Sequence, residues 1–362
     1  MTRNGPSTSM LAGAVQWVPT MSAWLDGALL AETVPVRRGR LSADGSSQVP
    51  ERLTFSVPRW ADRRDWLPGD DATHPLARFG QYVIPTIVVT SPITGIQYET
   101  VLGRFKIQNW KHDTDSGLIN VEAVGVLQVA ADDRLPSPLA PTGTLASEFR
   151  RLLPPGLSAA ISPALVDRQC PRSMEWSDDR IGALYEIADA WPARIRTDQW
   201  GQIAVLPALA DTPTPVVSLT DGEGGTVIGT ARADTRDQAY NRIVVRASST
   251  DSANRPPIQV VVDQTSGPMS ASGPYLPVTK FWSSPLIETA TQARAAGITM
   301  LANSLRPSRT VPVTLAPDPR LDLDDAVEII SDGVRDWGYI TAYDLPLTID
   351  DGEMRVDIGV SS

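Results

Sequence analysis

Residues 99–107 (ETVLGRFKI) and 119–124 (INVEAV) alternate apolar and polar side chains, and the turn-forming residues 115–117 (DSG) lie between them. Alternation with a period of two indicates a strand with one buried face. A short polar turn between two such runs predicts a hairpin. Residues 53–57 (LTFSV) repeat the alternation, so we expect the first part of the chain to be a barrel or sandwich of short strands.

The composition agrees with a folded, strand-rich chain. Of its 362 residues, 42% are hydrophobic and 20% are charged, and 26 glycines and 31 prolines are spread along the sequence. These fractions are ordinary for a globular protein. Proline cannot donate to a strand ladder and interrupts helices, so its abundance indicates many turns. A chain of this length is expected to form two to four domains.

Helical signals begin after a proline-containing linker at residues 135–138 (LPSP). Residues 144–153 place apolar side chains on one helical face. A second helix is expected from a cap at Ser177 or Asp178 to a stop at Pro192, because small polar residues cap helix starts and proline ends helices. This region therefore differs in kind from the strand-rich region before it.

Residues 193–206 favour a hairpin around a polar turn and belong to the same middle region. Strands return after about residue 226, where residues 286–305 also follow helical spacing. The other strands in this part are expected at residues 243–245, 258–262, 311–315, 326–330, 337–342 and 355–358.

The sequence thus predicts a β-rich α+β chain with three parts. Residues 1–138 are expected to form an N-terminal β-barrel domain, and residues 139–225 a small α+β domain. Residues 226–362 are expected to form a second β-barrel domain with a helical insertion around 286–305, since closing strands follow that helix.

The formal net charge of −10 argues against a dedicated DNA or RNA binder. Neutralising phosphates requires clustered Lys and Arg. An acidic wall is still compatible with a passage through which DNA slides without sticking. The first ten residues have no sustained apolar run and predict no secretory signal. No stretch approaches the ~18 apolar residues of a membrane span.

Candidate catalytic residues are few. Cys170 is the single cysteine, and His74 and His112 are the two histidines. No intramolecular disulfide or cysteine-based zinc site is possible. Neither histidine lies in a nucleophile signature, and Cys170 is expected to be a structural thiol. A pair of carboxylates for glycoside cleavage stays open, because folding alone brings such a pair together.

Two other stretches suggest ligands but lack required residues. Residues 318–325 (DPRLDLDD) are acidic, yet they lack the glycine of a calcium loop. We interpret them as a solvated turn before a strand. Residues 222–226 (GEGGT) lack the Lys-Ser/Thr pair and the third glycine of nucleotide-binding loops. We therefore predict no catalytic residue, no metal ligand and no cofactor site.

Ten tryptophans are scattered along the chain. Most are expected to pack in cores and at their rims. Trp60 and Trp66 differ because they lie in a polar segment, residues 58–66 (PRWADRRDW). Tryptophan is enriched at protein interfaces, so we predict these two as candidate interface residues.

Four regions of the chain resemble minor tail proteins of phages that infect actinobacteria, within the wider group of phage tail hub proteins. The regions are residues 34–41 (VPVRRGRL) with 50–58 (PERLTFSVP), 75–81 (PLARFGQ) and 102–107 (LGRFKI); 180–206; 235–245 (TRDQAYNRIVV); and 318–329 (DPRLDLDDAVEI). In residues 318–329, relatives often read Pro-x-Leu-x-x-Gly-Asp, whereas this chain has Asp324 and Asp325 where Gly-Asp is expected.

The resemblance implies two tail-hub β-barrel domains with smaller α+β modules between and beside them. Three copies would form a ring that adapts a sixfold tail tube to a threefold tip. Expected partners are two further copies of the chain, the distal tail protein ring, the C-terminus of the tape measure protein, and a tip or receptor-binding protein. The protein would lie at the tail tip of the virion after synthesis in the host cytoplasm. DNA would contact it only in passing through a channel with an acidic wall.

Some tail hub relatives carry an appended peptidase or glycan-degrading domain. This chain ends soon after the expected second barrel, so we expect no enzymatic activity. Three alternatives stay open. They are a carbohydrate- or receptor-binding tail protein, a tail-associated cell-wall hydrolase, and a hub of a contractile injection system.

Overall fold

The computed structural model describes residues 3–212, 214–237, 239–248, 258–306 and 309–360. A 15-stranded sheet dominates it, with the path β15-β20-β23-β22-β3-β4-β10-β9-β7-β1-β2; β8 pairs with β7, β14 with β21, β21 with β22, and β16 with β20. Its strands are β1 (Gln16–Leu25), β2 (Ala28–Ala31), β3 (Arg38–Asp44), β4 (Glu51–Pro58), β7 (Tyr82–Thr90), β8 (Gln97–Val101), β9 (Phe105–Asp113), β10 (Leu118–Gly125), β14 (Val217–Thr220), β15 (Val227–Thr230), β16 (Ala233–Asp234), β20 (Arg309–Leu315), β21 (Ala326–Ser331), β22 (Val334–Pro346) and β23 (Met354–Val360).

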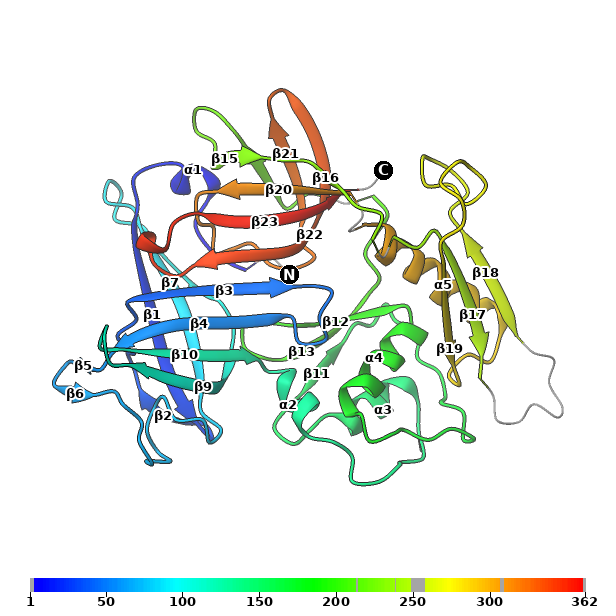
Figure 1. Ribbon diagram of the computed structural model, residues 1–362, viewed down its shortest axis with the longest axis horizontal. Helices are drawn as coiled ribbons and strands as arrows, with labels where there is room; N and C mark the ends of the chain where they lie inside the picture. The colour runs from blue at the N-terminus through cyan, green and yellow to red at the C-terminus, as the bar shows by residue number, and fades with distance from the viewer. Residues whose placement is uncertain (1–2, 213, 238, 249–257, 307–308, 361–362) are drawn as a thin grey trace.

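The two strand-rich regions of the sequence meet in this sheet. β22 pairs antiparallel with β3, from Ala342 opposite Asp44 to Pro346 opposite Arg40. Figure 1 shows β23, β22, β3, β4 and β10 stacked in this order. The prediction of a β-rich fold is confirmed. Two separate closed barrels are not confirmed, because strands of both regions share one sheet.

Alternation of side chains explains the first hydrophobic core. Every second residue of β7 is buried, and β4 buries Leu53, Phe55 and Val57. These side chains share one cluster with residues of the last strands, such as Ile340 and Ile358. We call the 15-stranded sheet, with the short elements attached to it, the first body. The short elements are α1 (Thr8–Leu11), β5 (Trp60–Ala61), β6 (Arg64–Asp65) and the 3-10 helix η2 (Ile349–Asp351).

The hairpin predicted around residues 115–117 is confirmed as β9 and β10. The single strand predicted at residues 99–107 is wrong, because the chain leaves the ladder between β8 and β9. The backbone amide of Leu102 donates to Pro85 at 2.9 Å, and Gly103 has a φ of +153°. This positive φ is open to glycine but rare for other residues. β8 then pairs with β7, and β9 pairs with β10.

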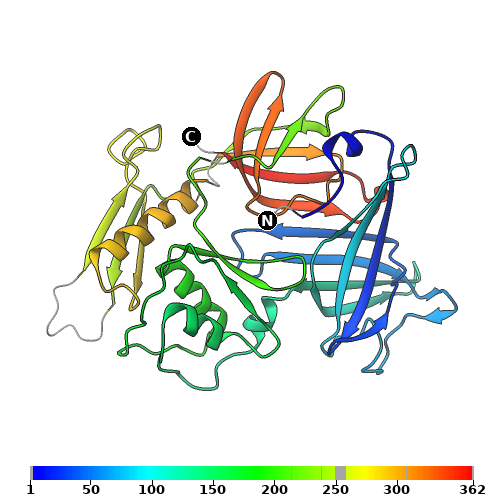
Figure 2. The same cartoon turned by 180° about the vertical axis from the view of Figure 1, so that it is seen from behind.

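The second body has its own core. One part of it comes from α2 (Gln128–Asp132), α3 (Leu145–Leu152), α4 (Arg180–Ala190) and a sheet of β11 (Ala159–Ile161), β13 (Ile203–Pro207) and β12 (Ala193–Thr197). The other part is a sheet of β18 (Gln259–Asp263), β17 (Arg242–Ala247) and β19 (Thr279–Ser284), with α5 (Ala290–Leu305). Figure 2 shows α5 lying across this second sheet. Side chains from both parts form one cluster.

The helix starts are set by their caps. Thr144 and Thr289 each form a capping box, so α5 begins at Ala290 and not at residue 286 as predicted. The side chain of Asp179 accepts from the amide of Gly182 at 3.1 Å and caps α4. The predicted caps Ser177 and Asp178 are wrong by one or two positions. None of the helices in the described ranges has the length and apolarity to span a membrane.

Gly338 on β22 gives a first testable prediction. A Cβ added there would overlap the backbone carbonyl oxygen of Gly359 and would lie 2.8 Å from Ile358 Cγ2. The backbone of the paired β23 cannot move without opening the ladder. We expect Gly338→Ala to lower the free energy of unfolding by about 1–3 kcal/mol, measured by urea denaturation. Gly229→Ala, where a Cβ has open space, is the control and should change stability by less than about 0.5 kcal/mol.

Candidate functional site

The acidic segment at residues 318–325 lies at the junction between the two bodies. The turn was predicted correctly, but the prediction that it is solvated is wrong. Asp318 is 1% exposed and Asp325 is 4% exposed. Asp318 pairs with Arg320 at 2.6 Å, and Asp324 pairs with Arg196 at 2.7 Å and with Arg194. Burial of these carboxylates is tolerated because arginines compensate their charge.

Asp324 has a left-handed backbone, with a φ of +65°. This is the conformation that glycine adopts freely, and it stands where the resemblance leads one to expect glycine. Asp tolerates it better than most residues. The amide of Asp324 donates to Ile340 at 2.9 Å. Although burial acts to raise the pKa of Asp324, Arg196 and Arg194 hold that pKa below its usual value.

The N-terminus reaches the same junction. Arg3 is 6% exposed. Its guanidinium donates to the carbonyl of Leu321 at 2.8 Å and to the hydroxyl of Tyr343 at 2.9 Å. It also pairs with Asp322 at 3.0 Å. One side chain near the start of the chain therefore satisfies groups that lie more than 300 residues later.

Two further hydrogen bonds cross the junction. The hydroxyl of Thr197 donates to Glu51, and the hydroxyl of Tyr185 donates to the carbonyl of Gln48 at 2.9 Å. Burial raises the pKa of Glu51 and raises that of Tyr185 to about 12. A pocket of about 10 Å³ lies between Arg3, Glu51 and neighbouring residues, which is space for about one water molecule and not for a substrate.

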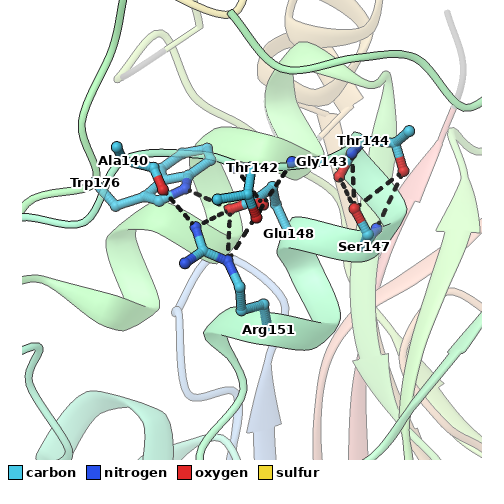
Figure 3. Close-up of polar contacts among 8 residues, drawn as sticks. All are labelled: Ala140, Thr142, Gly143, Thr144, Ser147, Glu148, Arg151 and Trp176. Carbon is cyan, nitrogen blue, oxygen red and sulfur yellow. Dashed lines mark hydrogen bonds and ion pairs between the residues drawn. The ribbon is translucent and has the colours of Figure 1, made fainter. Parts of the chain in front are cut away.

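A second buried carboxylate organises the second body (Figure 3). Glu148 on α3 has a side chain that is 1% exposed. It accepts from the amides of Thr142 and Gly143 at 3.0 Å each, and from the indole of Trp176 at 2.9 Å. The guanidinium of Arg151 donates to both of its oxygens, at 3.2 and 3.1 Å. Against the effect of burial, which raises it, these donors lower the pKa of Glu148.

Glu148 and Asp324 suit structure better than catalysis. A general acid or base needs a proton that it can exchange near neutral pH. Glu148 and Asp324 are held ionised by arginines and are occupied by donors. Within the described ranges, no group of three or more His, Cys, Asp and Glu side chains is arranged to hold a metal ion.

The structure separates the two predicted interface tryptophans. Trp60 is 67% exposed on the short β5–β6 hairpin, with Arg59 over its ring at 5.8 Å. Trp66 is 3% exposed and belongs to the first core, where His74 meets its ring edge-on at 6.4 Å. Trp66 therefore supports the hairpin from inside, and the interface role stays a prediction for Trp60.

Cys170, the two histidines and the glycine-rich residues 222–226 lie in cores, strands or turns. Cys170 lies in the second core, and burial raises its pKa to about 12. A protonated thiol is unreactive. His74 is buried, and His112 lies on β9 opposite Ile119. Residues 222–226 form a tight turn. Gln238, in one of the stretches that carry the resemblance, lies outside the described residues.

Sequence reasoning missed the residues that hold the junction. Arg194 and Arg196 alternate on β12, a spacing that places both side chains on one face of the strand. The sequence near these two arginines did not show which carboxylate they pair with, because Asp324 lies far along the chain. Glu148 and Arg151 stand three residues apart on α3, which also indicated a pair. Nothing near Arg3 indicated burial.

Comparison with known proteins gives matches at the level of structure. No family model matches the sequence, and no curated protein matches it at a significant level. A tail protein from Neisseria meningitidis MC58 is 13% identical with a TM-score of 0.63, covering 94% of this chain and 96% of that one. The 43 kDa tail protein of prophage MuSo2 from Shewanella oneidensis is 13% identical with a TM-score of 0.61, covering 94% and 98%.

A third similar structure is the prophage tail protein gp18 from Listeria monocytogenes EGD-e. It is 11% identical with a TM-score of 0.53, and the match covers 93% of this chain and 94% of that one. All three matches extend through both bodies, because each covers more than nine-tenths of this chain. Over nearly its whole length, the chain therefore has the fold of these three tail proteins, two of which come from prophages.

Proposed function

We propose that this chain is a structural hub protein at the tip of a phage tail. The observation that carries the proposal is the near-complete mutual coverage with the tail proteins from Neisseria and Shewanella, at 94% of this chain and 96–98% of theirs. A chance likeness of one barrel would not extend through the second body as well. The four stretches of sequence that resemble tail hub proteins support the same assignment.

The proposed assembly is a homotrimeric ring that adapts a sixfold tail tube to a threefold tip. The pairing of β22 with β3 supports this arrangement, because it joins the two strand-rich regions edge to edge within one chain. Two barrel-like halves in each of three copies would present six similar units to the tube. Its partners would be the distal tail protein ring, the tape measure C-terminus and a tip or receptor-binding protein.

The ring would surround the channel through which DNA leaves the virion. The net charge of −10 supports a wall that repels phosphate and creates no sticking points. The protein itself would carry out no reaction. The arginine-bound states of Glu148 and Asp324 support that part of the proposal. An assembled ring with a basic lumen would contradict the acidic channel.

The mass of the purified chain in solution tests the trimer. Light scattering across a concentration series should give three times the chain mass of 39.0 kDa. Recombinant distal tail protein should increase the trimer fraction. A monomer at every concentration, also with that partner present, would contradict the hub. Binding of cell-wall glycan by such a monomer would favour the receptor-binding alternative, and release of glycan fragments would favour the hydrolase.

Trp60 tests where a partner binds. The variant Trp60→Ala should change stability by less than about 0.5 kcal/mol, because the side chain is exposed. We expect it to weaken assembly with a tail partner about ten-fold or more, as loss of an interface tryptophan does. Trp200→Ala removes a tryptophan that is 62% exposed on the second body and is the matched control. Equal effects of the two variants would remove the special role of Trp60.

A further inference from the structure

The two bodies are joined by polar groups rather than by a common core. The two clusters of buried apolar residues have no described member in common. One side chain of the first body, Val49 in the turn between β3 and β4, packs against the second core. Bodies with separate cores are able to move relative to one another without disrupting either core.

Asp324 is the centre of the polar junction. Its side chain is 7% exposed and meets two arginines of β12, whose side chains are 23% and 18% exposed. Thr197 and Glu51 form a hydrogen bond nearby. Arg306, which follows α5 in the second body, lies over the ring of Tyr339 on β22 at 5.1 Å. The amide of Asp324 donates to the carbonyl of Ile340, the neighbour of Tyr339, so the contacts from β12 and from the end of α5 meet close together near the middle of β22.

The arginines are held in position by their own body. Arg194 Nε donates to the carbonyl of Pro207 at 3.0 Å, and an amino group of Arg196 donates to the carbonyl of Ile195 at 2.8 Å. Asp324 is fixed in the first body by the hydrogen bond that its backbone amide donates to the carbonyl of Ile340. At the junction, two positioned arginines of the second body therefore face one positioned carboxylate of the first body.

We propose that Asp324, Arg194 and Arg196 form a latch, and that the second body swings relative to the first when this latch opens. Burial strips both partners of an ion pair of their hydration, and they regain it when the pair separates, so the desolvation cost offsets part of the attraction that holds the pair closed. The junction therefore has two discrete states, closed and dry or open and hydrated. Such two-state contacts underlie rigid-body transitions between domains.

The distance between the two bodies tests the latch in the full chain. Spin labels are introduced at Ile93→Cys on the first body and Val166→Cys on the second, which are 86% and 84% exposed. Cys170 stays unlabelled because its thiol is buried and protonated. Double electron–electron resonance should give one narrow distribution of label-to-label distances for the parent. In Asp324→Asn, the fraction of molecules with a label-to-label distance outside the parent peak should rise about ten-fold. Asparagine keeps the left-handed backbone but loses the charge.

Asp263→Asn is the matched control. Asp263 pairs with Arg242 at 2.6 Å inside the second body, so its variant should keep the narrow distance of the parent. The same narrow distribution for Asp324→Asn and the parent would overturn the latch. If Asp324→Asn does not fold, Arg194→Gln and Arg196→Gln each leave one ion pair. Both should then widen the distribution, and an unchanged distribution in both would equally overturn the proposal.

Discussion

Replacement of Glu148 by alanine is expected to lower the free energy of unfolding by about 3–5 kcal/mol, the usual cost of breaking a buried ion pair from one side. The change removes the acceptor shared by the amides of Thr142 and Gly143 and the indole of Trp176, and it removes the carboxylate that pairs with Arg151. These donors belong to segments on both sides of α3, so the whole segment from residue 139 to 177 would loosen. Chemical denaturation followed by tryptophan fluorescence measures the loss.

Two variants separate charge from shape at this position. Glu148→Gln keeps one carbonyl oxygen and should cost less than alanine, by at least about 1 kcal/mol. Glu175→Ala removes an exposed carboxylate of the same body and should cost less than about 0.5 kcal/mol. Equal losses for Glu148→Ala and Glu175→Ala would show that Glu148 does not organise this segment.

The same carboxylate predicts a pH dependence. The pKa of Glu148 is lower in the folded protein than in the unfolded chain, where glutamate titrates at about 4.3. A depressed folded pKa contributes stability that is complete above the unfolded pKa and is lost as the pH falls through the folded pKa. Between about pH 5 and pH 3, the parent should therefore lose more stability than Glu148→Gln. Parallel pH profiles of the two proteins would contradict this.

Arg3→Ala is the second variant with a large expected effect, again about 3–5 kcal/mol. It leaves the buried hydroxyl of Tyr343 and the carboxylate of Asp322 without their cation, and it removes the donor to Leu321. Because Arg3 joins the N-terminus to the turn before β21, the loss should appear as a lower unfolding midpoint for the first body. Calorimetry with the full chain measures it.

Arg3→Lys tests the geometry of this anchor. Lysine keeps the charge but lacks the planar fork that reaches several acceptors at once, so we expect it to recover part of the loss only. Arg134→Ala is the control, because Arg134 pairs with Asp178 where their side chains are 68% and 61% exposed. Surface pairs of this kind contribute about 0–1 kcal/mol. Full recovery by lysine would mean that charge alone matters at residue 3.

Several elements were predictable because their signals are local. The apolar face of α3, the β9–β10 turn and the alternation in β4 depend on residues that are close together in the sequence. Local backbone preferences and side-chain periodicity act before any distant contact forms. The prediction of one continuous strand through Gly103 failed for the opposite reason. The amide of Leu102 donates to the carbonyl of Pro85, which lies on another strand.

The junction shows where local signals end. Residues 318–325 carry four aspartates and one arginine, and in isolation such a segment belongs in water. The fold buries it because β12 supplies Arg194 and Arg196 and the N-terminus supplies Arg3. No window of sequence contains all these partners. The pair Trp60 and Trp66 separates in the same way, since only packing decides which indole enters the core.

The sequence by itself determined the strand-rich character of the chain, the positions of α3, α4 and α5 and of strands such as β4, β10 and β23, and the resemblance to phage tail hubs. The tertiary structure alone decided that both strand-rich regions share one sheet, that β17–β19 and α5 join the core of the middle region, and that the acidic turn is buried. The physical reason is the distance along the sequence over which each interaction acts. Periodicity and capping act over a few residues, whereas burial of a charge is decided by partners that only the folded chain brings within about 3 Å.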